Sequence, residues 1–406
     1  MTGARQKRVS RASRINSRIN HKRSHKGAGK SSRALPALSS LQALPTWADL
    51  TPTEGQQQAF QKAANTLSER EGADPTEYEL GCVVRLDRSF PAILTEQRLC
   101  RAEFSAALTK WGDSKVAVGD WVCLRVPVQY EEMLIEEILP RKSALERWRG
   151  GSRGEKQVLT ANGDLVLVAQ AIGPHGIDYN RLVRSCVIAR DCGCDTAIIL
   201  TKADRCKSEQ ELAAIVRKVI TSVGGDTPIC VTTTKTAGLE EPLHHLEDKF
   251  KVGIGSQAVE NLVGRGTVAL VLGESGVGKS TLLNSLMGHD VLKTGSVRRS
   301  DDAGRHTTVA RQMVRLPTGA IIIDMPGLRT LPLVGHERGL AKVFPDIAAY
   351  AAQCRFRDCT HTTEPGCAVK QALDEGKFAC ARYEAYVALA QEMRDSAQSL
   401  DPDVTL

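Results

Sequence analysis

The spacing of hydrophobic and polar positions changes along the chain, and each stretch predicts a different kind of fold. Between Tyr78 and Leu139, short runs of β-forming residues alternate with turn residues. This spacing is typical of a small β-barrel. The predicted strands are 79–86, 92–95, 99–103, 121–127 and 132–138. Five short strands within about 60 residues favour an OB-fold, which is a five-stranded barrel.

After Pro140, short apolar runs alternate with stretches of helical periodicity. The predicted strands are 165–170, 197–200, 229–232, 268–272 and 321–324, and the predicted helices are 179–190, 208–222 and 279–287. This alternation predicts a parallel sheet with helices on both faces. The C-terminal part reads as mainly helical, with a helix over 378–392. Before Tyr78 the pattern is weak, apart from a helical stretch over 56–71.

Charge separates the N-terminal tail from the rest of the chain. Of the 406 residues, 1–33 carry eleven Lys and Arg and no acid, whereas the rest has 43 basic and 47 acidic residues. A cationic arm of this kind suits the phosphate backbone of nucleic acid. A transit peptide is the alternative, although the tail lacks a clear amphipathic apolar face. With no secretory signal and no apolar run of about 18 residues, we expect a cytoplasmic protein without a membrane partner, or one in an organelle stroma or matrix if the tail is a transit peptide.

The strongest motif is the G-x-x-x-x-G-K-[ST] segment that begins at Gly273. It follows the predicted strand 268–272 and opens the predicted helix 279–287, as a phosphate-binding loop requires. Its glycines let backbone N–H groups surround a phosphate, Lys279 would hold the β- and γ-phosphates, and Ser280 would bind Mg²⁺. The predicted nucleotide-contacting residues are Gly273, Glu274, Ser275, Gly276, Val277, Gly278, Lys279, Ser280 and Thr281.

Two downstream segments have the positions of nucleotide switches. Asp324 ends the predicted strand 321–324 and begins the sequence D-M-P-G, so its carboxylate would reach Mg²⁺ through water and Gly327 would sense the γ-phosphate. Between the loop and this segment lies 304–308, where a threonine would complete the Mg²⁺ shell. Thr308 is favoured, and Thr307 is the alternative.

A guanine-type motif comes before the phosphate-binding loop. Thr201, Lys202, Ala203 and Asp204 end a buried strand and read T-K-x-D, close to the usual N-K-x-D. Asp204 would accept two hydrogen bonds from guanine that adenine cannot offer, so GTP is the predicted nucleotide. Thr201 replaces the usual Asn, which leaves one supporting hydrogen bond open, and 231–233 is a plausible partner loop for the base. Since this motif precedes Gly273 by about 70 residues, the domain is circularly permuted.

Four potential metal ligands lie close together near the C-terminus. Cys354-x4-Cys359-x-His361-x5-Cys367 offers three thiolates and one imidazole, which suits a tetrahedral structural zinc site. The spacing departs from the common C-x2-C, so reduced loop cysteines without a metal remain the alternative.

The motifs resemble, in their order, the RsgA (YjeQ) family of circularly permuted GTPases that assist small ribosomal subunit assembly. The resemblance covers about residues 75–395 and includes the segments 161–164, 356–361 and 364–367. It implies one zinc ion bound by Cys354, Cys359, His361 and Cys367. It also implies that the OB domain and the zinc domain bind ribosomal RNA. The expected multidomain organisation is a basic, disordered tail (1–72), a five-stranded OB-fold β-barrel (73–142), a circularly permuted α/β P-loop GTPase domain (143–335) and a helical zinc-binding domain (336–406).

The predicted reaction is GTP hydrolysis to GDP and phosphate, with Mg²⁺ and with stimulation by the ribosome. Ras-type enzymes orient water with a glutamine, but Leu328 stands at that position here. His306 is therefore the predicted water-positioning residue, acting with Lys279 and Thr308. The expected partners are the small (30S) ribosomal subunit and its rRNA. The protein is expected to bind them as a monomer. The alternatives are an RNA-binding factor that uses GTP as a slow switch, and a GTPase that regulates a non-ribosomal partner.

Overall fold

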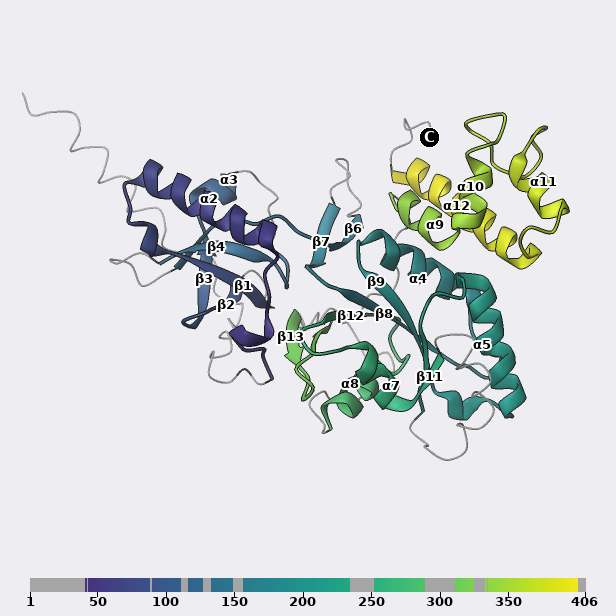
Figure 1. Ribbon diagram of the computed structural model, residues 1–406, viewed down its shortest axis with the longest axis horizontal. Helices are drawn as coiled ribbons and strands as arrows, with labels where there is room; N and C mark the ends of the chain where they lie inside the picture. The colour runs from purple at the N-terminus through teal and green to yellow at the C-terminus, as the bar shows by residue number, and fades with distance from the viewer. Residues whose placement is uncertain are drawn as a thin grey trace, which may run out of the picture. The chain divides into compact units, whose positions relative to one another are not determined.

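The computed structural model describes most of the chain beyond residue 40 (Figure 1). The described residues are 41, 43–87, 90–110, 116–126, 133–148, 156–233, 252–288, 311–324, 333 and 335–400. Within these ranges, no helix is both long enough and apolar enough to cross a membrane.

The predicted barrel is present and closed. Its strands are β1 (Tyr78–Asp87), β2 (Phe90–Thr95), β3 (Leu99–Phe104), β4 (Trp121–Arg125) and β5 (Met133–Ile138). They pair in the order β1-β2-β3-β5-β4, and β4 returns to β1, so the sheet closes on itself. The interior is filled by fully buried side chains from alternating positions, including Val83, Ile93, Val122, Leu124 and Ile135. All five predicted strands are confirmed, and the closed five-stranded barrel is OB-like.

The helical stretch predicted over 56–71 is confirmed as a helix in the last part of the N-terminal segment. A short 3₁₀ turn at Trp47–Asp49 precedes α2 (Glu54–Glu71), and the chain then enters a second turn at Pro75–Glu77. A capping box between Thr53 and Gln56 starts α2, and its Leu67 is buried. Sequence periodicity shows this helix only weakly because Leu67 is the one large apolar residue among its buried positions, the others being Gln56, Ala63 and Ala64.

A seven-strand region of the sheet forms the central domain. The strand order is β11-β10-β9-β8-β12-β14-β13, with β13 antiparallel to β14 and the others parallel. The bounds are β8 (Leu165–Ala171), β9 (Asp195–Thr201), β10 (Ile229–Val231), β11 (Val252–Ile254), β12 (Val268–Leu272), β13 (Arg311–Arg315) and β14 (Ile321–Asp324). The predicted parallel strands are confirmed. The strands at the two ends of this region, β11 and β13, were not predicted, and β13 also pairs with β1 of the barrel. The hairpin of β6 (Ala144–Trp148) and β7 (Lys156–Ala161) was not predicted either.

Helices cover both faces of this sheet (Figure 1). Alternate residues of β8 point to opposite sides: Val166 and Val168 join the core under α4 and α5, whereas Leu165 and Leu167 join the core under α7 and α8. The bounds are α4 (Tyr179–Asp191), α5 (Glu209–Val223), α7 (Gly255–Leu262) and α8 (Lys279–Met287), with α3 (Ala106–Lys110) in the barrel. A strand that is apolar on both sides is what a sheet covered on both faces requires.

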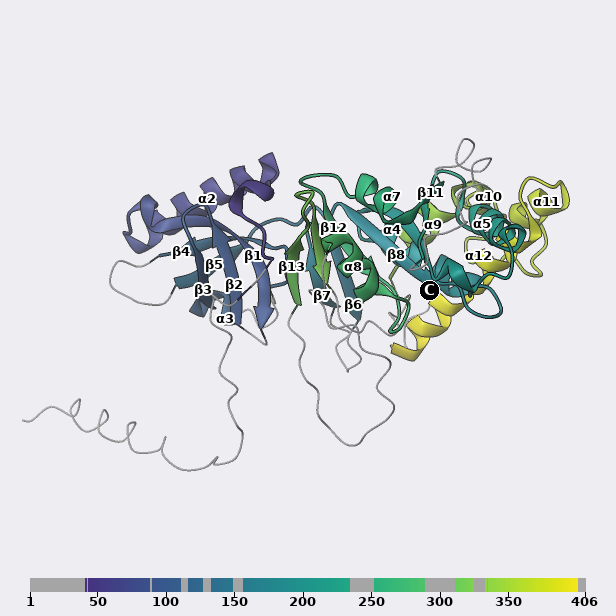
Figure 2. The same ribbon diagram turned by 90° about the horizontal axis from the view of Figure 1, so that it is seen from below.

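Four helices form the C-terminal group (Figure 2). They are α9 (Glu337–Val343), α10 (Pro345–Ala351), α11 (Ala368–Asp374) and α12 (Cys380–Leu400). Close contact of α9 with α4 needs Gly339, because a Cβ there would lie 2.2 Å from the carbonyl oxygen of Val187. Asp191, the last residue of α4, accepts hydrogen bonds from the Gly339 N–H at 3.0 Å and pairs with the His336 ring at 2.9 Å.

A buried asparagine joins α2, the turn before β4 and the segment before β6. Asn162 has a φ of 58°, and its Oδ1 accepts hydrogen bonds from Gln56 Nε2 and the Lys142 N–H, both at 2.9 Å. Its Nδ2 donates to the Gly119 carbonyl at 2.8 Å. Asparagine suits this position because it tolerates the left-handed conformation better than most residues.

Asn162→Ala should therefore be strongly destabilising. It leaves three polar groups without this partner, two of them in buried hydrogen bonds whose loss costs about 1–3 kcal/mol each, and puts alanine in a left-handed conformation. We expect a loss of about 3 kcal/mol or more in the free energy of unfolding, measured by urea denaturation. Asn261→Ala, at an exposed position in α7, is the matched control and should stay within about 0.5 kcal/mol of the parent. Equal stability of the two variants would contradict the prediction.

Candidate nucleotide and zinc sites

The phosphate-binding loop joins the central strand β12 to α8. Gly276 and Gly278 have φ values of 82° and 103°, which side chains rarely adopt. At Gly273, an added Cβ would lie 2.6 Å from the Ala169 carbonyl oxygen of β8, so only glycine fits beside that strand. Lys279, the first residue of α8, donates from Nζ to the carbonyl oxygens of Gly273 and Glu274, both at 2.6 Å. The ammonium group is thus held against the loop that would surround a phosphate.

The structure brings the T-K-x-D motif against this loop. Thr201 ends β9 and is buried, and its hydroxyl donates to the Val277 carbonyl oxygen. Lys202 has a φ of 59°, and its ammonium donates to the Gly276 carbonyl oxygen. Threonine in place of asparagine therefore still ties this strand end to the loop. The motif and the loop lie together although the chain places them far apart.

The predicted partner loop for the base also lies beside the motif. The Thr233 hydroxyl donates to Asp204 Oδ1 at 3.0 Å, and the Ala203 N–H donates to the Thr232 carbonyl oxygen at 3.2 Å. Ala203 and Asp204 belong to a short 3₁₀ turn, Ala203–Arg205, and Asp204 is exposed. This leaves the Asp204 carboxylate accessible, with one oxygen oriented by a hydroxyl.

Two residues expected to supply oxygen ligands for Mg²⁺ belong to neighbouring elements of the fold. Ser280 is in the first turn of α8, and Asp324 is the last residue of β14, which pairs directly with β12. Hydroxyl and carboxylate oxygens suit this hard cation. Of the other predicted residues, Ser275 lies in the loop and Thr281 in α8. His306, Thr307, Thr308 and Gly327 lie outside the described residues, so their roles stay predictions.

Asp204→Asn should change which base the site prefers. A carboxylate accepts from the N1–H and the exocyclic amine of guanine, whereas xanthine has a carbonyl oxygen in place of that amine and pairs better with an amide. Losing a charged hydrogen-bond acceptor costs about 1.5–3 kcal/mol, so we expect about 10- to 100-fold weaker binding of GTP. Affinities for GTP and xanthosine triphosphate, measured by displacement of a fluorescent nucleotide, test this. Asp226→Asn, on a surface turn, is the control. If Asp204→Asn preferred GTP over xanthosine triphosphate as strongly as the parent does, the base assignment would be contradicted.

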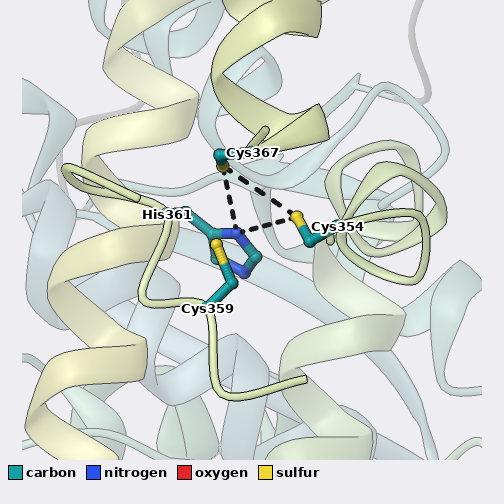
Figure 3. Close-up of side chains that lie close together, drawn as sticks. All are labelled: Cys354, Cys359, His361 and Cys367. Atoms are coloured by element: carbon teal, nitrogen blue, oxygen red, sulfur yellow. Dashed lines mark hydrogen bonds between the residues drawn. The ribbon is translucent and has the colours of Figure 1, made fainter. Parts of the chain in front are cut away.

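The four predicted zinc ligands converge on one point (Figure 3). The ligand atoms of Cys354, Cys359, His361 and Cys367 all lie within 4.8 Å of one another. Cys354 Sγ lies 3.9 Å from Cys367 Sγ, and His361 Nδ1 lies 3.5 and 3.6 Å from these two sulfurs. A tetrahedral zinc ion with its usual bond lengths separates two sulfurs by about 3.8 Å and a sulfur from a nitrogen by about 3.6 Å. The group could therefore bind one zinc ion through Nδ1 of the histidine.

Neighbouring residues support this geometry. Cys367 caps α11, His361 has a φ of 64°, and the Tyr383 hydroxyl donates to the His361 carbonyl oxygen at 2.7 Å. Burial raises the pKa of the Cys359 thiol to about 12, with further contributions from the thiols of Cys367 and Cys354. A bound cation would hold these ligands as thiolates at neutral pH, which is how a structural metal couples to folding.

One contact near the nucleotide loop was not predicted. Arg181, in the first turn of α4, forms an ion pair of 2.9 Å with Glu274 of the phosphate-binding loop. No sequence motif indicates that Arg181 and Glu274 form a pair, and 93 positions separate them in the chain. Only the folded sheet brings the start of α4 beside the loop.

Together, these features define a circularly permuted P-loop GTPase with an N-terminal OB-like barrel and a C-terminal Cys₃His group. The family model for the RsgA GTPase matches residues 138–260 and 253–334. The chain belongs to the RsgA family of GTP hydrolases. It is 36% identical over 312 residues to "Small ribosomal subunit biogenesis GTPase RsgA" of Streptomyces avermitilis, an alignment that covers 77% of this chain and 79% of that relative.

Two solved structures share the fold. One is the crystal structure of YjeQ from Thermotoga maritima, with a TM-score of 0.56 and 24% identity, covering 78% of this chain and 99% of the other. The second is that of YloQ, described as a circularly permuted GTPase, with a TM-score of 0.53 and 20% identity, covering 78% and 96%. These comparisons confirm the predicted family and fold class. The predicted bounds of the four segments stay predictions.

Proposed function

We propose that the chain hydrolyses GTP while bound to the small ribosomal subunit and its rRNA, and so assists late maturation of that subunit. The similarity to proteins named for small ribosomal subunit biogenesis, over 77% of the chain, is the observation that carries this proposal. The guanine-type motif held against the phosphate-binding loop supports GTP as the substrate. We also propose that the protein acts as a monomer in the cytoplasm.

Each site residue has a proposed role in this reaction. Lys279 binds the β- and γ-phosphates, and Asp204 reads the base. Mg²⁺, when bound, would neutralise charge on the phosphates; Ser280 and Thr308 would hold it, and Asp324 would contact it through water. Gly327 senses the γ-phosphate, and His306 orients the attacking water because Leu328 has no polar group for this task. The zinc site stabilises the C-terminal helices and has no catalytic role.

GTP hydrolysis measured with small subunits, with large subunits or with neither tests the proposal. At fixed Mg²⁺ and salt, we expect stimulation by the small subunit alone and loss of that stimulation in His306→Ala. Equal, slow rates in all three conditions would overturn ribosomal stimulation. Because Leu328 replaces the usual glutamine, a slow switch is the second candidate, and single-turnover rates that stay negligible with small subunits would favour it.

A further inference from the structure

Phe356 is a large apolar side chain that the zinc loop leaves in solvent. It is 40% exposed, and among the described residues only one other large hydrophobic side chain, Phe90, is exposed to this degree. The nearby helices have an aromatic core of their own, with Phe344 packed on Tyr386 and Tyr350 packed on Phe378. Packing therefore does not explain a phenylalanine at this position.

The backbone that carries Phe356 is fixed on both sides. The residue lies between two of the zinc ligands, and its carbonyl oxygen accepts a hydrogen bond from the Cys359 N–H at 3.4 Å. The N–H of Arg355 donates to the Gly366 carbonyl oxygen, also at 3.4 Å. Zinc bound at the Cys₃His group would hold this loop still, so a partner would meet a ring that is already ordered, at little entropic cost.

Two arginines flank the ring. The Arg355 guanidinium carbon lies 5.4 Å from the centroid of the Phe356 ring, and its side chain runs over Gly366, where an added Cβ would lie 3.4 Å from Arg355 Cβ. Arg357 follows Phe356 in the sequence and is exposed. In the part of the chain that the structure describes, neither arginine forms an ion pair with a carboxylate; Asp358 is the nearest acid in sequence.

The other acidic group of this loop is held by hydrogen bonds within the loop. Glu364 accepts hydrogen bonds from the Thr360 N–H at 2.9 Å and the Thr362 N–H at 3.0 Å. These bonds, led by those from Thr360, lower the pKa of Glu364 to about 2. The loop therefore presents an exposed aromatic residue with an arginine before and after it in the sequence, and hydrogen bonds within the loop occupy one of its two carboxylates.

We infer that Phe356 stacks on an unpaired base of RNA while Arg355 and Arg357 contact the adjacent phosphates. An aromatic ring between cationic side chains matches a single strand, which offers a base face and phosphates together. Paired bases in a duplex cover their faces, so single-stranded RNA is the expected ligand. This inference rests on the proposed function, since it names the part of the rRNA that the zinc loop contacts.

The test compares full-length Phe356→Leu and Phe356→Trp with the parent. Leucine keeps the apolar surface without the aromatic face, and tryptophan keeps both. Affinities are measured for small ribosomal subunits and for a fluorescein-labelled single-stranded RNA of about 12 nucleotides. We expect the leucine variant to bind both about 5- to 100-fold more weakly, and the tryptophan variant to bind as well as the parent or better. Zinc content and basal GTP hydrolysis should stay unchanged in both.

Salt dependence distinguishes the ring from the arginines. Arg357→Ala should reduce the slope of log affinity against log salt by about 0.7 for single-stranded RNA, whereas Phe356→Leu should leave that slope unchanged. Parent-like binding by Phe356→Leu overturns the stacking inference and leaves the proposed function intact. Weaker binding to subunits with unchanged binding to RNA also overturns it, since the ring would then contact a ribosomal protein. No binding of the parent to small subunits would overturn the proposed function itself.

Discussion

Lys279→Ala should abolish GTP hydrolysis, with a loss of at least about 100-fold in kcat/KM at any concentration of small subunits. Its Nζ lies 2.6 Å from two carbonyl oxygens of the phosphate-binding loop, those of Gly273 and Glu274, at the first turn of α8. A triphosphate placed there without it would lose a charge-assisted hydrogen bond to its most charged groups. Alanine, a good helix former, keeps α8 intact.

Nucleotide-induced stabilisation separates a binding defect from misfolding. A ligand at 100 times its Kd stabilises a protein by about 2.7 kcal/mol, so GTP with Mg²⁺ should raise the Tm of the parent and leave that of Lys279→Ala unchanged. Lys207→Ala, at an exposed position before α5, serves as the control and should respond like the parent. An undiminished GTP response in Lys279→Ala would show that the segment at Gly273 is not the phosphate site.

Cys359→Ala should remove the zinc ion and loosen the C-terminal helices. Structural zinc supplies roughly 10–16 kcal/mol in zinc-finger peptides at neutral pH, and three remaining ligands cannot complete the tetrahedron. We expect less than one zinc per chain in a chromophoric chelator assay, faster amide exchange in α11 and α12, and weaker binding to small subunits. GTP affinity should change little, since the phosphate-binding loop joins β12 to α8 and is not part of the C-terminal helices.

Cys380→Ala is the matched control for zinc loss. Cys380 begins α12, is exposed, and donates to Glu384 rather than to the ligand group. This variant should keep one zinc per chain and the amide protection of the parent. If Cys359→Ala kept its zinc, its helices and its RNA binding, the Cys₃His assignment would be wrong.

The sequence predicts the central domain well because its strands carry an unmistakable local signal. β8, β9 and β12 are continuous apolar runs, and the loop after β12 has a motif whose glycines the backbone requires. β13 was missed because its sequence, Arg-Gln-Met-Val-Arg, has only two apolar residues, as an antiparallel strand near the barrel permits. Local pattern identifies strands by burial, and a strand with little buried surface gives no such pattern.

Hydrogen bonds between residues far apart in the chain lie beyond such prediction. Thr201 could be placed in a base motif, but its hydrogen bond to Val277 joins residues 76 positions apart. Gln56 caps its own helix and also reaches Asn162, 106 positions away. Both bonds depend on the packed arrangement of several elements. The metal ligands were predictable because they lie in one short segment, whereas the use of Nδ1 follows only from the fold.

The position of β12 in the sheet has a consequence for synthesis of the chain. β8 to β11 form one side of the sheet, and β8 pairs with β12, which the chain reaches about 100 residues later. At roughly 5–20 residues per second, a translating ribosome takes about 5–20 s to produce that stretch. During this time the edge of β8, with the sequence Leu-Val-Leu-Val-Ala, has no neighbour on the β12 side. The nascent chain must therefore protect an apolar strand edge, the kind of surface that causes aggregation, until β12 emerges.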